Sequence, residues 1–533
     1  MRPLRISVSL LLVLLGACIR SAELPHEPGR VAGYLMLHGS GELSPAALEA
    51  FVKFSGGPKA VIVYVAQGDG SDPYPKIEVP GVFQKCGAAS VRLLTLRHAD
   101  DANNAELIAS VRNATGVWLA PWNSNAEFAK SITGTALEKE LRALSKRDGV
   151  LGVSGAMATL FGQAMIRSEN DKTDIVKGLG FLPGGVVDVL TAHRTGNEAL
   201  LAALKHRPEL VGFGIEPGGT LLARGRNLVA IGAPIHVCVA ASATRTAREE
   251  VLPPNRGGSP ERWPADLVAL QRAAMARMQP AFPPAKMAPP EVPIGTLVID
   301  GGGIPKDALL RFIEAAGGPD ALIVAFPTAM SDTPPANPSE ARMLQRAGAK
   351  NVKVFHLAER ADAFDEEKIK ILREAKGIWF CGGRQWRYVD VYLDSPAEKL
   401  MHEVLSRGGA IGGSSAGATI QGEYLVRGNP LGNMQMMAEG YERGFGFLKG
   451  VAIDQHFVKR NRFADMTAFK KAFPQVLGLG IDEGAALVVT GHTLEVVGLG
   501  QVCIYDVRQP AEGQPDYVAV KSGEKFDLST LKK

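Results

Sequence analysis

The chain has 533 residues, of which 46% are apolar and 21% are charged, and its formal net charge is +4. That length is too great for one hydrophobic core and predicts two domains of roughly 200 residues each, plus connections. The net charge is small and no basic run is interleaved with aromatic residues, which argues against nucleic acid as a partner.

Residues 1–22 have the pattern of an export signal. Arg2 and Arg5 precede a largely apolar run over residues 6–17, which is too short to span a bilayer and has the length of a signal-peptide core. The Leu-Gly-Ala-Cys sequence that ends at Cys18 resembles the bacterial lipobox, in which the cysteine is lipidated after cleavage. We therefore expect an exported protein, periplasmic or on the outer surface. Either Cys18 attaches it to the membrane, or ordinary cleavage a few residues later removes this cysteine.

The remaining cysteines predict neither disulfides nor a zinc site. They lie far apart in or near apolar stretches, without a CxxC pair, so we expect buried free thiols: Cys86, Cys238, Cys381 and Cys503. Gly301-Gly302-Gly303 follows an apolar run but lacks a G-x-G-x-x-G continuation, which favours a tight turn at the substrate mouth. We expect no metal and no cofactor.

The chain repeats its own pattern, which predicts a tandem duplication. The matching pairs of segments are 33–41 with 295–303, 60–64 with 321–325, 116–119 with 377–380, and 178–182 with 444–448. In each copy, short Val, Ile and Leu-rich runs alternate with helical patterns such as 365–375 and 395–406. This order predicts an α/β fold of two tandem three-layer sandwiches, each a mainly parallel sheet with helices on both faces.

The copies give the predicted domain boundaries. We expect a first domain over residues 30–240, a Pro-rich linker over 241–292 that encloses a helix from Asp266 to Met278, a second domain over 293–510 and a C-terminal tail over 511–533. Ligands of such sheets bind at the carboxyl ends of the strands.

The second copy contains a G-x-S-x-G sequence centred on Ser415. A short apolar run precedes it and a helix can begin after it, so Ser415 would lie on a tight strand-to-helix turn. Gly413 and Gly417 would let the backbone turn sharply and let the helix pack closely on the strand. In a chain with 60 glycines, an ordinary glycine-rich turn is the alternative.

Two further predicted strand ends carry the groups that a nucleophilic serine needs. One ends at His456, which can take the hydroxyl proton, and the other ends at Asp482 and Glu483, which can orient the histidine. Taken singly, the histidine could be structural and the acidic pair could be solvated. A rival set would combine Asp454 or Asp482 with His492, which lies in a polar turn.

Together these segments resemble the cyanophycinase branch of the cyanophycinase and aspartyl dipeptidase family of serine peptidases. The resemblance runs from Gly295 to roughly Arg508 and rests on four blocks in the family's order: 382–385, 413–418, 454–462 and 480–483. It implies a flavodoxin-like or class I glutamine-amidotransferase-like fold, in agreement with the strand pattern.

The resemblance also implies roles for single residues. Ser415 would be the nucleophile, His456 the general base and then acid, and Glu483 the partner of the histidine. The backbone N–H groups of Ala416 and Gly383 would form the oxyanion hole. The positions that would line the substrate pocket are Gln385, Asp454, Gln455, Arg460 and Arg462.

Asp465 departs from the family pattern. Where cyanophycinases usually place a third arginine, this chain has an aspartate. If Asp465 lies in the substrate pocket, the charge of the pocket changes by two units, and the substrate specificity can move away from the polymer cyanophycin. If it faces solvent, it has no such effect.

The first copy lacks the three reactive side chains. Gly155, Leu190 and Pro217 stand opposite Ser415, His456 and Glu483, Met157 stands opposite Gly417, and Pro121-Trp122 replaces the Gly-Gly pair. Ser154 and His193 could act only after a one-residue shift, which turns a side chain away from the exposed turn. We expect no activity from this copy.

Two function classes remain. The first is a peptidase that cleaves peptide or isopeptide bonds next to aspartate in a cyanophycin-like or aspartyl-peptide substrate, through an acyl-enzyme. The alternative is a surface protein that binds a peptide or polymer without cleaving it. In either class we expect the first copy to dock on the second as an intramolecular pseudo-dimer.

Overall fold

The computed structural model describes residues 27–533 except 69–78, 122–124, 170–171, 195, 256–262 and 507–514. The predicted signal peptide and Cys18 lie outside the described residues, so export and lipidation stay predictions. Among the helices of the described part, none is long and apolar enough to cross a membrane.

The first half of the chain consists of β1 (Val31–His38), α1 (Pro45–Phe54), β2 (Val61–Gln67), α2 (Val79–Lys85), β3 (Ser90–Leu96), α3 (Ala105–Asn113), β4 (Gly116–Leu119), α4 (Asn125–Ile132), α5 (Ala136–Lys146), β5 (Val150–Ser154), β6 (Gly162–Glu169), β7 (Lys172–Lys177), β8 (Leu182–Val189), α6 (Glu198–His206), β9 (Val211–Ile215), β10 (Thr220–Gly225), β11 (Asn227–Ile231), β12 (Ile235–Val239), β13 (Arg248–Leu252), β14 (Ala265–Asp266) and α7 (Leu267–Ala276).

The second half consists of β15 (Val292–Asp300), α8 (Lys306–Ala315), β16 (Ile323–Phe326), α9 (Ser339–Arg346), β17 (Val352–Val354), α10 (Glu366–Ile369), α11 (Ile371–Glu374), β18 (Gly377–Phe380), α12 (Trp386–Tyr392), α13 (Pro396–Ser406), β19 (Ala410–Ser414), α14 (Ala416–Thr419), β20 (Gly422–Tyr424), β21 (Leu448–Gln455), α15 (Phe463–Ala472), β22 (Leu477–Ile481), β23 (Ala485–Gly491), β24 (Thr493–Gly498), β25 (Gln501–Tyr505), β26 (Val518–Lys521) and β27 (Lys525–Asp527).

The two halves have the same strand order. The large sheet runs β3-β2-β4-β5-β1-β10-β11-β14 in the first half and β17-β16-β18-β19-β15-β23-β24-β27 in the second. In each, the first five strands are parallel and the last three are antiparallel. The smaller sheets, β7-β6-β8-β9-β12-β13 and β20-β21-β22-β25-β26, also match apart from β7. This agreement supports the inferred duplication.

The predicted α/β class is confirmed, with one difference in the sheets. Each half has two mixed sheets, where the sequence pattern predicts one mainly parallel sheet. The reason is local: short turns join β10 to β11 and β23 to β24, and such turns can make only antiparallel neighbours.

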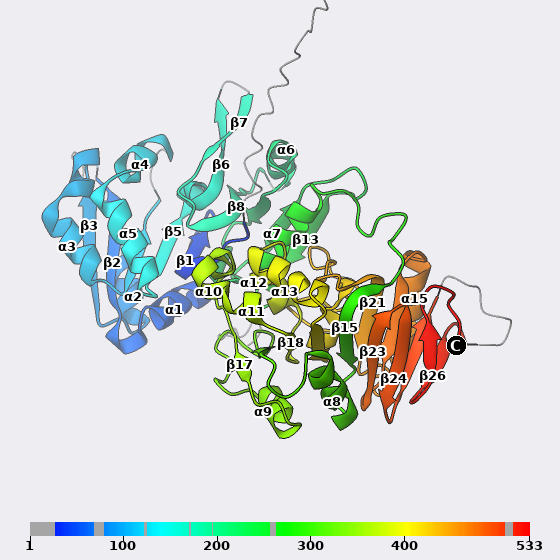
Figure 1. Ribbon diagram of the computed structural model, residues 1–533. Coiled ribbons are helices and arrows are strands. Elements are labelled where there is room, and N and C mark those ends of the chain that lie inside the picture. Colours follow the sequence, from blue (N-terminus) through cyan, green and yellow to red (C-terminus); the bar gives the residue numbers. More distant parts are fainter. Residues whose placement is uncertain are drawn as a thin grey trace, which may run out of the picture.

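Successive side chains of β15 point to opposite faces of the large sheet, which shows how the layers of the second half pack. Val298 contacts a cluster on α8 and β18 that includes Phe312 and Trp379. Leu297 and Ile299 point to the opposite face and join the core that contains α13 and the inner face of the small sheet. The small sheet thus lies against the large one, and α15 packs on its outer face. Figure 1 shows these layers in green to red.

The predicted linker and tail both contribute strands. β13 pairs with β12, and α7, which lies within the predicted helix Asp266–Met278, packs against β9 and β12. At the C-terminal end, β26 joins the small sheet and β27 joins the large one. Prolines after β13 and on both sides of α7 give this region the composition of a linker, although its strands and helix pack on the first half.

A buried polar network joins the halves. Arg226, in the turn between β10 and β11, donates to Asp390 of α12 at 2.6 Å and to the Tyr441 hydroxyl at 3.0 Å. Arg272 of α7 donates to the same aspartate at 2.7 Å. The Arg226 guanidinium also lies 4.1 Å from the centre of the Trp386 ring. The bond from Arg272 to Asp390 joins α7 to α12, and Figure 1 shows these two helices side by side.

The cysteines of the described part are unpaired, as predicted. Cys238, Cys381 and Cys503 are buried free thiols, and Cys86 is partly buried. In the same part of the chain, no group of three or more His, Cys, Asp and Glu side chains could hold a metal ion.

Candidate active site

Ser415 lies on a strained turn between β19 and α14. Its φ of 54° and ψ of −112° are unusual for a residue with a side chain, and its N–H donates to the carbonyl oxygen of Asp300 at 3.0 Å. The flanking glycines are needed for close packing: a Cβ would lie 1.9 Å from the Phe380 carbonyl oxygen at Gly417, and 2.5 Å from the Gly417 carbonyl oxygen at Gly413. The turn therefore has the geometry of a nucleophile elbow.

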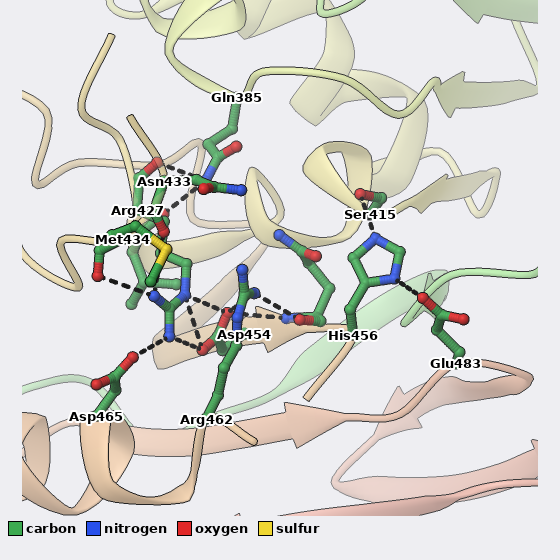
Figure 2. Close-up of polar contacts among 12 residues, drawn as sticks. Gln385, Ser415, Arg427, Asn433, Met434, Asp454, His456, Arg462, Asp465 and Glu483 are labelled. Carbon is green, nitrogen blue, oxygen red and sulfur yellow. Dashed lines mark hydrogen bonds and ion pairs between the residues drawn. The ribbon is translucent and has the colours of Figure 1, made fainter. Parts of the chain in front are cut away.

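His456 and Glu483 follow the carboxyl ends of the neighbouring parallel strands β21 and β22, which pair Gln455 with Ile481. His456 Nε2 lies 2.9 Å from Ser415 Oγ, and His456 Nδ1 lies 2.7 Å from Glu483 Oε1. Figure 2 shows the three side chains in a row. The structure thus brings together the serine, histidine and glutamate that the sequence predicts, as one hydrogen-bonded chain.

The electrostatics of this chain favour a neutral imidazole beside a charged carboxylate. Burial and the nearby Arg460 charge lower the pKa of His456, and they outweigh the opposing effect of Glu483. Lys459 donates to Glu483 Oε2 at 2.5 Å, and this bond lowers the pKa of the carboxyl group together with the bond from His456. Lys459 was missed at the sequence level, although it lies only three residues after the histidine.

Two backbone segments lie next to the serine, the start of α14 and the Gly382-Gly383 loop. Ala416 is the first residue of α14, where an N–H has no partner within the helix. The Gly382-Gly383 loop lies beside the serine, since a Cβ placed on Gly382 would lie 3.4 Å from Ser415 Cβ. Glu340, which the sequence did not single out, holds this loop by accepting the Gly382 N–H at 2.8 Å.

Gln385 and Asp454 are buried. Gln385 Nε2 donates to the carbonyl oxygens of Val426 at 2.8 Å and Arg427 at 2.9 Å, so this side chain fixes a loop. The Asp454 carboxylate is fully buried and accepts from Arg427 and Arg462.

Gln455 is also buried. Its Oε1 has no hydrogen-bond partner among the described residues.

The two predicted pocket arginines differ. Arg462 is buried and donates to Asp454 at 2.7 Å and to the Gln455 carbonyl oxygen at 2.6 Å. Burial lowers the pKa of this guanidinium to about 10. Arg460 is exposed. The predicted arginine pair thus contains one group engaged inside the protein and one at the surface.

Asp465 forms an ion pair with the buried Arg427. The Arg427 guanidinium is 2% exposed, donates to Asp454 through Nε and Nη2, and reaches Asp465 at 2.7 Å. The Nη1 group donates to the carbonyl oxygens of Asn433 and Met434 at 3.1 and 3.2 Å. Asp465 is half exposed, yet it pairs with a buried cation at the site (Figure 2). No motif marks Arg427 in the sequence.

The alternative sets of reactive residues, which would use His492 in the second half or Ser154 and His193 in the first, do not form catalytic hydrogen bonds among the described residues. His492 lies in the turn between β23 and β24 and contacts the Pro290 carbonyl oxygen and Glu291. In the first half, Ser154 is buried and accepts from the Trp118 indole at 2.9 Å, while His193 is exposed.

Strand register tests the comparison of the two halves. β1 pairs His38 with Ser154 as β15 pairs Asp300 with Ser414, which places Gly155 opposite Ser415. By the same argument for β8, β9, β21 and β22, Leu190 stands opposite His456 and Pro217 opposite Glu483. Trp122 lies outside the described residues.

Comparisons with known proteins give the family. Residues 300–497 match peptidase family S51. A cyanophycinase from Geminocystis herdmanii is 31% identical over 204 residues, which cover 38% of this chain and 75% of that protein. A cyanophycinase from Synechococcus elongatus is 32% identical over 232 residues, covering 43% and 71%. A solved peptidase from an acI-B1 actinobacterium aligns with a TM-score of 0.34 at 23% identity, over 44% of this chain and 97% of that one. Through its second half, this protein belongs to peptidase family S51, the cyanophycinase and aspartyl dipeptidase family of serine peptidases.

Proposed function

We propose that the second half cleaves peptide or isopeptide bonds next to aspartate through an acyl-enzyme on Ser415. The observation that carries this proposal is the chain of two hydrogen bonds, 2.9 and 2.7 Å long, that links Ser415, His456 and Glu483. A neutral imidazole beside a charged carboxylate is the state in which a histidine can accept the hydroxyl proton.

In the first step, His456 Nε2 takes the proton as Ser415 Oγ bonds to the substrate carbonyl carbon. The N–H groups of Ala416 and Gly383 stabilise the negative charge on the carbonyl oxygen. The carbon–nitrogen bond then breaks while His456 gives its proton to the leaving nitrogen. Water, deprotonated by the same histidine, attacks the ester in the second step and frees the acid and the serine.

The charges around the site support a substrate with an acidic group. Arg427 and Arg462 are compensated by Asp454 and Asp465, so these four groups contribute no net charge. Arg460 remains at the surface and is the guanidinium that we assign to a substrate carboxylate. Relatives named cyanophycinase make β-aspartyl-arginine units the first substrate to test.

The test is a cleavage assay of the full chain on cyanophycin, β-aspartyl peptides, α-aspartyl peptides and unsubstituted alanine peptides. We expect Ser415→Ala to reduce turnover by about 10³-fold or more while the fold is kept. Ser154→Ala in the first half is the matched control and should keep full activity. A Ser415→Ala form that retains near-normal rates, or equal cleavage of alanine peptides, would refute the proposal.

We also propose that the first half has no peptidase site and serves as an internal partner of the second. Gly155, Leu190 and Pro217 at the three register positions support this. Export, with or without a lipid on Cys18, is proposed from the N-terminal pattern alone. Mass spectrometry of the mature N-terminus distinguishes a lipidated cysteine from its removal.

A further inference from the structure

A buried carboxyl group lies directly behind the candidate site. Asp300 is the last residue of β15 and is fully buried. Its Oδ2 accepts the N–H of Gly302 at 3.1 Å, and its Oδ1 has no hydrogen-bond partner among the described residues. The carboxyl group therefore pins the next turn of its own chain, residues 300–302.

This turn contacts every segment that carries a reactive side chain. The Asp300 carbonyl oxygen accepts the Ser415 N–H at 3.0 Å, and the Gly301 carbonyl oxygen accepts the His456 N–H at 2.9 Å. The Gly302 carbonyl oxygen accepts the N–H of Gly484, the residue after Glu483, at 2.6 Å. Three consecutive carbonyl groups thus fix the backbone of three separate strand ends.

Gly302 also packs against the imidazole ring. Its φ is +123°, and a Cβ at this position would lie 2.4 Å from His456 Cε1 and 2.6 Å from Nδ1. A displacement of the turn by a fraction of an ångström must therefore move the ring or open a gap behind it. The position of the turn sets the position of the ring between Ser415 and Glu483.

The first half has different residues at these positions. His38 stands opposite Asp300 by strand register, and its ring contacts Thr220 Oγ1 at 2.9 Å and the Gly41 carbonyl oxygen at 3.2 Å. The Ser40 carbonyl oxygen accepts the Gly218 N–H, just as the Gly302 carbonyl oxygen accepts the Gly484 N–H. Ser40 therefore stands opposite Gly302. The half without a histidine at the site thus has a side chain where Gly302 leaves room for the ring.

We propose that Asp300 is a positioning residue of the peptidase: through the Gly302 N–H its carboxyl group holds the turn that aligns Ser415, His456 and Glu483. This inference rests on the proposed function, because it assumes that Ser415 is the nucleophile. Burial raises the pKa of Asp300 to about 7, so the neutral carboxyl is well populated near neutral pH. Asparagine is neutral, has nearly the same shape and can accept the same N–H, which makes it the conservative replacement.

The experiment measures the rate at which a fluorophosphonate labels the full chain, so that it does not depend on the identity of the substrate. Asp300→Ala should slow labelling by about 10- to 100-fold, because a misplacement of about 1 Å costs a rate of that order. Asp300→Asn should stay within about threefold of the unmodified protein. His38→Ala, the matched change in the first half, should label at the unmodified rate.

A second readout reports the ring itself. The downfield proton NMR signal of the hydrogen bond between His456 and Glu483 should be present in the unmodified protein and in Asp300→Asn, and shifted or lost in Asp300→Ala. If Asp300→Ala folds and labels at the unmodified rate, the proposal is wrong. If Asp300→Ala does not fold, the Asp300→Asn variant decides between the outcomes. Slow labelling of Asp300→Asn at a native melting temperature overturns the proposal. Near-normal labelling of Asp300→Asn with the downfield signal retained supports it. Failure of the unmodified protein to label would instead refute the role of Ser415.

Discussion

At the scale of single residues, the charges around His456 set the pH range in which the proposed mechanism can operate. In the proposed mechanism the imidazole must be neutral to accept the serine proton, and burial and Arg460 both lower its pKa below the ordinary value of 6.5. Glu483 acts in the opposite direction but does not reverse the shift. A group with a lowered pKa loses its proton at a lower pH, so the basic form is already dominant at neutral pH.

The first prediction concerns this pH dependence. Removing the Arg460 charge should raise the pKa of His456, so that Arg460→Gln moves the acid limb of the kcat/KM profile to higher pH. Because Arg460 is exposed, the displacement should be roughly half a pH unit or less. Added salt should displace the profile of the unmodified protein in the same direction and that of the variant less. A displacement to lower pH would contradict the assigned cause.

The second prediction concerns Asp465. Asp465→Asn removes one of the two carboxylates that balance the Arg427 and Arg462 charges, so the site becomes more positive. The KM for an acidic substrate should fall severalfold with little change in kcat, measured by initial rates at low ionic strength. Asp394→Asn, which removes an exposed aspartate paired with Arg443, is the control for the charge alone. An unchanged KM in the Asp465 variant would separate this residue from specificity.

At the scale of secondary-structure elements, much of the site could be predicted because its residues follow apolar runs. Ser415 and His456 come directly after a strand, and Glu483 comes two residues after one; each strand stands out in the sequence as a short apolar or glycine-containing run. Glu340 and Arg427 could not be found in this way. Each contacts the site through a long-range fold contact, and neither lies beside a recognisable motif.

The same reasoning explains the sheets. Alternation of strands with helices predicts parallel pairing, and it holds for β15 to β19. It fails where short turns make hairpins, as at β23 and β24, and where the Pro-rich segment that follows β13 gives this strand the composition of a linker.

The third prediction tests the close packing of the elbow. In Gly417→Ala the new Cβ would overlap the Phe380 carbonyl oxygen, so α14 must move away from β18. We expect a loss of stability of roughly 1–3 kcal/mol and a greater proportional loss of activity. Gly432→Ala is the matched control, since its Cβ would meet nothing within 4 Å. Thermal unfolding and turnover are measured on both, and equal melting temperatures would show that the packing is not required.

At the scale of the whole molecule, α12 connects the two halves to the site. Asp390, on the last turn of this helix, accepts from Arg226 and Arg272, whereas Gln385, at its beginning, fixes the loop of Val426. Although burial raises the pKa of Asp390, the two arginine charges outweigh it and lower the pKa of this carboxyl group. The first half therefore stabilises a buried charge on the helix that orders part of the site.

The last prediction separates this role from simple docking. Arg226→Met leaves the buried Asp390 with Arg272 and the Tyr441 hydroxyl, and it also removes the guanidinium that pairs with the buried Asp266. Breaking a buried pair costs roughly 3 kcal/mol. Arg245→Met removes ion pairs to Glu439 and Glu442 at the same contact between halves, but Arg245 is about a third exposed and its loss should cost about 1 kcal/mol or less. Because α12 also begins at the site, Arg226→Met should lower kcat as well as the melting temperature, whereas Arg245→Met should leave kcat unchanged. Circular dichroism melting and initial rates on the full chain measure both effects. If the two variants lose stability equally and keep the same kcat, the first half contributes only contact area. In that case its contact with α12 has no effect on the activity of Ser415.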